Sequence, residues 1–164
     1  MQRTLLICRH AETYEPYPLQ PDFERELTPH GLHQANQTGK WLRENFVKID
    51  SLLSSPATRA SATARSLASR LYFDTERIAY LPELYNAREA ELLHVLGHLP
   101  DEAKQVLLVG HNPGITKLAR DLTGQQIGYM EPGNVLAITL TLETWEGIHV
   151  QTGVLLRHNM EHVR

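Results

Sequence analysis

The sequence lacks several features that would assign it to a specialised class of protein. Its 164 residues include one cysteine, Cys8, which excludes an internal disulfide and most cysteine-rich zinc sites and is typical of a reducing compartment such as the cytoplasm. No apolar run approaches the roughly 20 residues of a membrane span. The net charge of −3 gives no bulk attraction to nucleic acid or anionic lipid. We therefore expect a cytoplasmic protein with neither a membrane nor a nucleic acid as partner, and any anion site must be built locally.

What is present is ordinary for a globular protein. Hydrophobic residues make up 41% and charged residues 21% of the chain, which argues against disorder. The length suits one hydrophobic core, so we expect a single domain over 1–164, and a monomer by default. Strand and helix patterns alternate along the chain. This alternation predicts an α/β fold with a largely parallel sheet and an antiparallel hairpin toward one edge.

The expected elements follow from periodicity and from helix start signals. Strands are expected near 4–8, 49–53, 78–81, 105–109, 135–142 and 148–156, and helices near 29–46, 56–71, 90–99 and 115–122. Thr28 and Ser55 are expected to cap the first two helices, and Leu32 to lie on the inner face of the first. A proline-rich loop, 11–26, contains Tyr14, Tyr17 and Phe23, and we expect it to form a wall beside the site and to cover the core.

The candidate catalytic residues follow predicted strands. Arg9 and His10 follow the first strand, Arg59 begins the helix after the second, and His111 follows the strand that ends at Gly110. The carboxyl ends of parallel strands share one edge of the sheet, where open α/β proteins bind ligands. Two arginines beside a helix N-terminus favour a phosphoryl group over a carboxylate. The arginines disfavour protonated imidazole, so His10 is the expected nucleophile.

These motifs resemble one known family. Arg9-His10-Ala11, the stretch 54–60, the stretch 109–114 and Pro132-Gly133-Asn134 together resemble the histidine phosphatase superfamily, and within it the SixA-type phosphohistidine phosphatases. The resemblance implies a three-layer α/β/α fold of the phosphoglycerate mutase type. It also implies that His10 is transiently phosphorylated, that Arg9, Arg59 and His111 complete the phosphate pocket, and that no metal or other cofactor is needed. Ala11 replaces the usual glycine of the first motif, as in SixA-like relatives.

The general acid is harder to place than the other four residues. Many relatives use a carboxylate from a segment after the second helix, for which Glu83 is the best candidate by position, with Glu12 and Glu89 behind it. A phosphohistidine substrate needs such an acid less than an ester does, because the leaving imidazole takes a proton readily from solvent.

Three functions remain open on the sequence. The first is a phosphatase with an open pocket that acts on phosphohistidine presented by another protein. The second is a small-molecule phosphomonoesterase acting on a sugar or nucleotide phosphate. The third is a catalytically silent phosphoprotein-binding module, against which the presence of His10 argues. His94 and His98 are spaced i, i+4, as are some metal ligands, but two ligands are too few for a zinc site.

Overall fold

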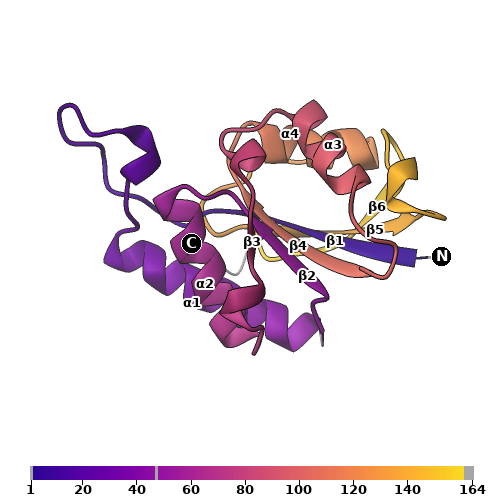
Figure 1. Ribbon diagram of the computed structural model, residues 1–164, viewed down its shortest axis with the longest axis horizontal. Helices are drawn as coiled ribbons and strands as arrows, with labels where there is room; N and C mark the ends of the chain where they lie inside the picture. Colours follow the sequence, from indigo (N-terminus) through magenta and orange to yellow (C-terminus); the bar gives the residue numbers. More distant parts are fainter. Residues whose placement is uncertain (1, 47, 161–164) are drawn as a thin grey trace.

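The computed structural model describes residues 2–46 and 48–160, and within them six strands form one sheet in the order β3-β2-β4-β1-β5-β6 (Figure 1). β4 pairs in parallel with both β1 and β2, and β2 with β3, whereas β5 is antiparallel to β1 and to β6. The strands are β1 Gln2–Arg9, β2 Ser51–Ser54, β3 Ala79–Tyr80, β4 Gln105–Gly110, β5 Val135–Thr141 and β6 Gly153–His158. The predicted sheet, with its antiparallel hairpin at one edge, is confirmed.

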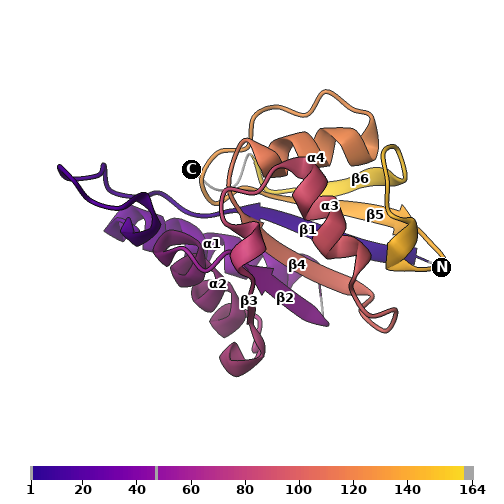
Figure 2. The same ribbon diagram turned by 45° about the horizontal axis from the view of Figure 1, so that its top comes forward.

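Helices cover both faces of the sheet and complete a three-layer fold (Figures 1 and 2). α1 and α2 lie on one face, and α3 and α4 on the other. Their bounds are α1 Pro29–Asn45, α2 Thr58–Arg70, α3 Glu89–Gly97 and α4 Gly114–Thr123, with short 3-10 turns η1 Asp22–Glu24, η2 Thr75–Arg77, η3 Pro82–Leu84 and η4 Trp145–Gly147. Within the described ranges, none of these helices combines the length and apolarity needed to cross a membrane.

Alternate residues of the central strands supply the two cores. In β1, Leu5 and Ile7 pack in the cluster beneath α3 and α4, while Leu6 and Cys8 pack in the cluster beneath α1 and α2. Successive strand residues point to opposite faces, so a strand covered on both sides is apolar throughout. Cys8 is fully buried, and this burial raises the pKa of its thiol to about 12. Cys8 is therefore a packing residue and not a reactive thiol.

Three local predictions were wrong. Leu32 is 48% exposed and lines a surface hollow near the start of α1, while Ala35 and Leu42 form the buried face of that helix. Ser55 does not cap α2, which begins at Thr58 without a side-chain cap, because the Ser55 hydroxyl contacts a histidine instead. The last strand begins at Gly153 and not at 148, because the preceding residues form a connection that includes η4. By contrast, Thr28 caps α1 as expected.

The proline-rich loop stands away from the body of the molecule (Figure 1). Its base is closed by a bridge between Thr13 and Leu27, while Tyr17 is 62% exposed and Leu19 is fully exposed. The prediction that this loop covers the core is therefore wrong. It returns to the body at η1, where Phe23 meets the ring of Tyr85 edge-on at 5.1 Å.

Candidate active site

The topology brings the four predicted residues to one edge of the sheet. β2, β4 and β1 are adjacent and parallel, so the residues that follow them are neighbours. The rings of His10 and His111 lie 5.3 Å apart, and Arg59, in the first turn of α2, donates from Nε to His10 Nε2 at 3.3 Å. All three side chains are buried. Arg9 ends β1 directly before His10.

The imidazole of His10 is held neutral and in one tautomer. Its Nδ1 lies 2.8 Å from the carbonyl oxygen of Ala11, which only accepts hydrogen bonds, so Nδ1 carries the proton and Nε2 keeps its lone pair. Burial lowers the pKa of His10 to about 4, and the charges of Arg59 and Arg9 act in the same direction, outweighing the Ala11 carbonyl. At neutral pH the ring is therefore uncharged and its lone pair faces Arg59.

His111 is oriented by Ser55. The Ser55 hydroxyl accepts from the backbone N–H of Ala57 at 3.2 Å and lies 2.8 Å from His111 Nε2. A serine hydroxyl has one proton to donate and two lone pairs that accept, so the contact orients the ring in either tautomer and leaves Nδ1 as the nitrogen that Ser55 does not reach. That Nδ1 is buried and has no partner among the described residues. His111 therefore holds an unused ring nitrogen, and burial lowers the pKa of its imidazole to about 3.

The two arginines supply the positive charge. Arg9 donates from Nη1 to the carbonyl of Met130 at 3.0 Å, and its buried Nε has no partner within the described residues. The guanidinium of Arg59 is largely buried, and its two terminal nitrogens reach Asp22, with Nη1 2.7 Å from the backbone oxygen and Nη2 3.0 Å from the carboxylate. The N–H donors of a planar guanidinium group match the spacing of the oxygens of a phosphoryl group. In this site, Arg9 has a free donor, and Arg59 has donors that are bound to a carboxylate.

Neighbouring motifs hold the backbone of the site in place. The hydroxyl of Thr63 accepts from the N–H of Ala11 and donates to the carbonyl of Arg59, so it joins the end of β1 to α2. The N–H of Gly133 is directed at the carbonyls of Arg9 and His10, and the Thr38 hydroxyl donates to the Gly133 carbonyl at 2.6 Å. Gly133 has φ of 81°, a left-handed conformation that favours glycine.

Asp22 and Tyr85 belong to the site, and sequence reasoning missed them in this role. Tyr85 donates from its hydroxyl to the Asp22 carboxylate at 2.6 Å, and its ring lies edge-on to His111 at 5.6 Å. Burial acts to raise the pKa of Asp22, but Tyr85 and Arg59 outweigh it and hold the pKa well below its usual range. No periodic pattern in the sequence signals either residue, because both lie in irregular segments.

The three candidate acids have other contacts among the described residues. Glu83 lines a hollow between β3 and α3 together with His94, and within the described residues no hydrogen bond or ion pair joins it to the four site residues. Glu12 accepts a hydrogen bond from the Thr28 hydroxyl, and Glu89 forms an ion pair with Lys117. The turn that carries Glu83 also carries Tyr85, whose ring lies edge-on to His111.

The other histidines that the structure describes do not form a metal cluster. The rings of His94 and His98 lie 4.5 Å apart, and His98 Nδ1 is hydrogen-bonded to the carbonyl of His94. Over 2–46 and 48–160 there is no group of three or more histidine, cysteine, aspartate or glutamate residues arranged to hold a metal ion.

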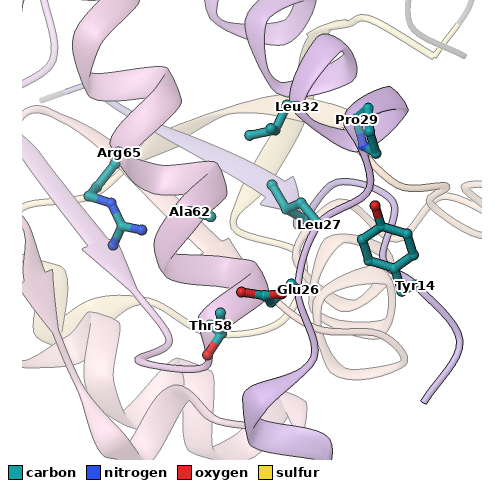
Figure 3. Close-up of a pocket in the computed structure, with 8 residues that line it drawn as sticks. All are labelled: Tyr14, Glu26, Leu27, Pro29, Leu32, Thr58, Ala62 and Arg65. Carbon is teal, nitrogen blue, oxygen red and sulfur yellow. The ribbon is translucent and has the colours of Figure 1, made fainter. Parts of the chain in front are cut away.

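A separate hollow of about 380 Å³ lies between the proline-rich loop, α1 and α2 (Figure 3). Figure 3 shows Tyr14 and Glu26 from the loop, Leu32 from α1, and Thr58 and Arg65 from α2 around it. None of the four site residues lines this hollow, and its walls carry one acidic and one basic side chain. Its lining therefore does not suit a phosphoryl group.

Comparisons with known proteins bear on the family of the chain. The family model described as histidine phosphatase superfamily (branch 1) matches residues 5–93. An uncharacterized protein of Mycobacterium leprae is 27% identical over 159 residues, which cover 90% of this chain and 96% of that protein. An uncharacterized protein of Mycobacterium tuberculosis is 32% identical over 111 residues, covering 68% of this chain and 66% of that protein.

Solved structures show the same fold. A protein of Nakamurella multipartitia, provisionally described as the phosphohistidine phosphatase SixA, has a TM-score of 0.82 and 25% identity over 96% of this chain and 95% of its own. The protein histidine phosphatase SixA complexed with tungstate has a TM-score of 0.80 and 23% identity over 94% and 95%. The matched family model, the three-layer fold and the grouping of Arg9, His10, Arg59 and His111 lead to one conclusion. This chain belongs to the histidine phosphatase superfamily.

Proposed function

We propose that this protein is a metal-independent phosphatase that works through phosphorylated His10 and removes phosphate from phosphohistidine on another protein. The observation that carries the proposal is the state of His10. Its Nδ1 proton is held by the Ala11 carbonyl, and its Nε2 lone pair faces a buried guanidinium. A neutral imidazole beside fixed positive charge is suited to attack a phosphoryl group and unsuited to mere binding of an anion.

In the first step, the Nε2 lone pair of His10 forms a bond to phosphorus as the bond to the leaving group breaks and its electron pair departs with that group. Arg9 offers its unpartnered Nε–H, and His111 offers Nδ1 in the tautomer that protonates it. The terminal nitrogens of Arg59 donate to Asp22 and each keep a second N–H for the phosphoryl oxygens. Two guanidinium groups supply the positive charge that Mg²⁺ supplies in kinases. In metal-dependent enzymes a bound ion neutralises charge, orients the substrate and polarises the reacting bond. Here side chains of the protein perform these roles.

In the second step, water attacks phosphorus and the bond to His10 breaks. The electron pair returns to Nε2, and because Nδ1 already carries a proton held by Ala11, His10 leaves as neutral imidazole. The proton of the attacking water goes to the phosphate product. The same nitrogen is therefore regenerated for the next cycle.

The substrate class is supported by the surroundings of His10. None of the three candidate acids is joined to the site residues by a hydrogen bond or ion pair within the described residues, and a phosphohistidine leaving group needs an acid least. The structural neighbours described as SixA point to the same substrate class. The same fold also occurs in an enzyme that acts on a small molecule. A phosphoserine phosphatase of Entamoeba histolytica matches this chain with a TM-score of 0.69 at 16% identity.

The test is phosphate release from a phosphohistidine-carrying protein and from p-nitrophenyl phosphate, with EDTA present, by wild type and His10→Ala. His30→Ala, which removes an exposed imidazole on α1, is the matched control. We expect turnover of the phosphoprotein that persists in EDTA, is retained in His30→Ala and is lost in His10→Ala. Preference for the ester would favour the phosphomonoesterase, and no turnover of either substrate by wild type would favour the silent binding module.

A further inference from the structure

We infer that the hollow between the proline-rich loop, α1 and α2 binds an apolar side chain of the protein that carries the phosphohistidine. That side chain lies about three to five residues from the phosphorylated histidine in the sequence of the bound protein. The inference deepens the proposed function and rests on it. Its basis is the nearness of the hollow to His10, the apolar lining of the hollow and the charges at its rim.

The hollow and the active site lie on adjacent faces of α2. Thr58 and Ala62, four residues apart, line the hollow. Arg59 and Thr63, each the next residue in the chain, face the site, where Arg59 donates to His10 and Thr63 accepts from the backbone that follows β1. Residues four apart share one side of a helix, so the first turns of α2 carry both surfaces side by side.

The distance between the hollow and the nucleophile suits a few residues of extended chain. The Cα atoms of Thr58 and Arg59 are about 3.8 Å apart, and an arginine side chain extends about 5 Å from Cα to Nε. With the 3.3 Å hydrogen bond to His10, the wall at Thr58 lies within roughly 12 Å of His10 Nε2. An extended segment of about three to five residues spans roughly 10–18 Å, which reaches from the site into the hollow.

The lining of the hollow is suited to an apolar side chain. Leu32 from α1 and Tyr14 from the loop are 48% and 52% exposed, and Leu27 and Ala62 also line the hollow (Figure 3). A side chain that enters removes these surfaces and its own from water, which favours binding. Concave apolar linings of this kind receive the anchor side chains of protein interfaces.

The rim of the hollow carries a charge of each sign. Glu26 belongs to the loop and Arg65 to α2, and neither side chain forms an ion pair or hydrogen bond with another described residue. Each can pair with an opposite charge on a bound chain and so fix its direction. An apolar centre with a charged rim is the arrangement found in protein–protein interfaces. The lining therefore favours a protein segment over a free phosphate compound.

The loop walls of the hollow are held in place by contacts across the base of the loop. The bridge between Thr13 and Leu27 closes this base, and the N–H of Tyr14 donates to the carbonyl of Glu26 at 3.0 Å. Arg25 donates to the Thr13 hydroxyl at 2.7 Å and to the Tyr14 carbonyl at 3.2 Å. Walls that are already ordered lose little conformational entropy when a partner binds, which favours affinity.

The test compares phosphoimidazole with two synthetic peptides of equal length, each with one central phosphohistidine. One peptide has leucine at the positions about three to five residues on either side of the histidine, and the other has serine there. Leu32→Ser and Tyr14→Ser each remove one apolar wall of the hollow. Leu156→Ser is the matched control, because it removes an exposed leucine on β6 that does not line the hollow. Phosphoimidazole is too small to reach the hollow and reports whether each variant keeps a folded active site.

We expect wild type to have a kcat/KM for the leucine peptide about tenfold or more above that for the serine peptide. Leu32→Ser and Tyr14→Ser are expected to reduce this preference to less than about threefold, with turnover of phosphoimidazole retained. Leu156→Ser is expected to keep the wild-type preference.

Equal kcat/KM values for the two peptides in wild type would overturn the inference, as would a preference that survives in both wall variants. A fall for all three substrates in both variants would assign these side chains to the fold and overturn it too. A wild-type dimer that Leu32→Ser dissociates in size-exclusion chromatography would assign the hollow to a second copy of the chain instead. Wild-type turnover of p-nitrophenyl phosphate without turnover of any of the three substrates would overturn the proposed substrate class as well.

Discussion

Acid should destabilise this protein through two buried histidines of its candidate active site. His10 and His111 are 8% and 3% exposed, and the pKa values of their imidazoles are lowered to about 4 and about 3. In the unfolded chain each has an ordinary pKa of about 6.5. Between the pKa values of the folded and unfolded states, these two histidines are protonated in the unfolded chain and neutral in the folded chain. The free energy of unfolding therefore falls as the pH is lowered.

The size of the effect follows from the two pKa differences. The stability that depends on neutral His10 and His111 is fully present above about pH 6.5. It is lost progressively as the pH falls toward the pKa values of these histidines in the folded protein. Going from pH 7.5 to pH 5.0, each histidine costs about 2 kcal/mol, or about 4 kcal/mol together. This loss is a large share of the free energy of unfolding of a typical domain, which is roughly 5–15 kcal/mol. The depressed pKa of Asp22 costs stability only below about pH 4, outside this window.

Urea unfolding at pH 7.5 and pH 5.0 measures this directly. The comparison uses wild type, His10→Gln, His111→Gln and the double variant, because glutamine keeps a polar side chain that does not titrate. We expect each single variant to lose about half of the wild-type change in unfolding free energy, and the double variant to lose most of it. A double variant with the full wild-type pH dependence would refute the reasoning, since the acid sensitivity would then arise elsewhere.

Two further changes test the packing and the orientation of the site. Ser55→Ala removes the hydroxyl that forms a hydrogen bond with His111 Nε2, so we expect kcat/KM to fall about tenfold to a hundredfold. We also expect the tautomer ratio of His111, read from ¹⁵N chemical shifts, to change, and an unchanged ratio would contradict a role for Ser55 in orienting the ring. Gly31→Ala places a Cβ 2.2 Å from the Glu12 carbonyl oxygen, so the backbone must shift. We expect this shift to lower the free energy of unfolding by about 1–3 kcal/mol, measured by thermal or urea unfolding. Gly128→Ala is the control and should change little, because a Cβ there meets nothing within 4 Å.

Much of the site could be predicted because it depends on regular elements. The apolar run of β4 and the pattern of β1 identify buried strands, and parallel strands bring their carboxyl ends to one edge. The residues that follow those strands, His10 and His111, are therefore neighbours whatever the details of the loops. Arg59 is equally constrained, because it lies in the first turn of the helix that follows β2.

The tertiary structure alone decided the rim of the site. The path of the proline-rich loop has no period, so nothing in the sequence indicates that Asp22 returns to Arg59 while Leu19, three residues earlier, stays exposed. In the turn after β3, only Leu84 separates Glu83 from Tyr85, and the direction of a short 3-10 turn determines which side chain faces the site. By itself the sequence determined the fold and the four central residues, because hydrophobic periodicity specifies strands and their ends. The contact between Asp22 and Arg59 depends on long-range packing between irregular segments, which only the folded chain brings together.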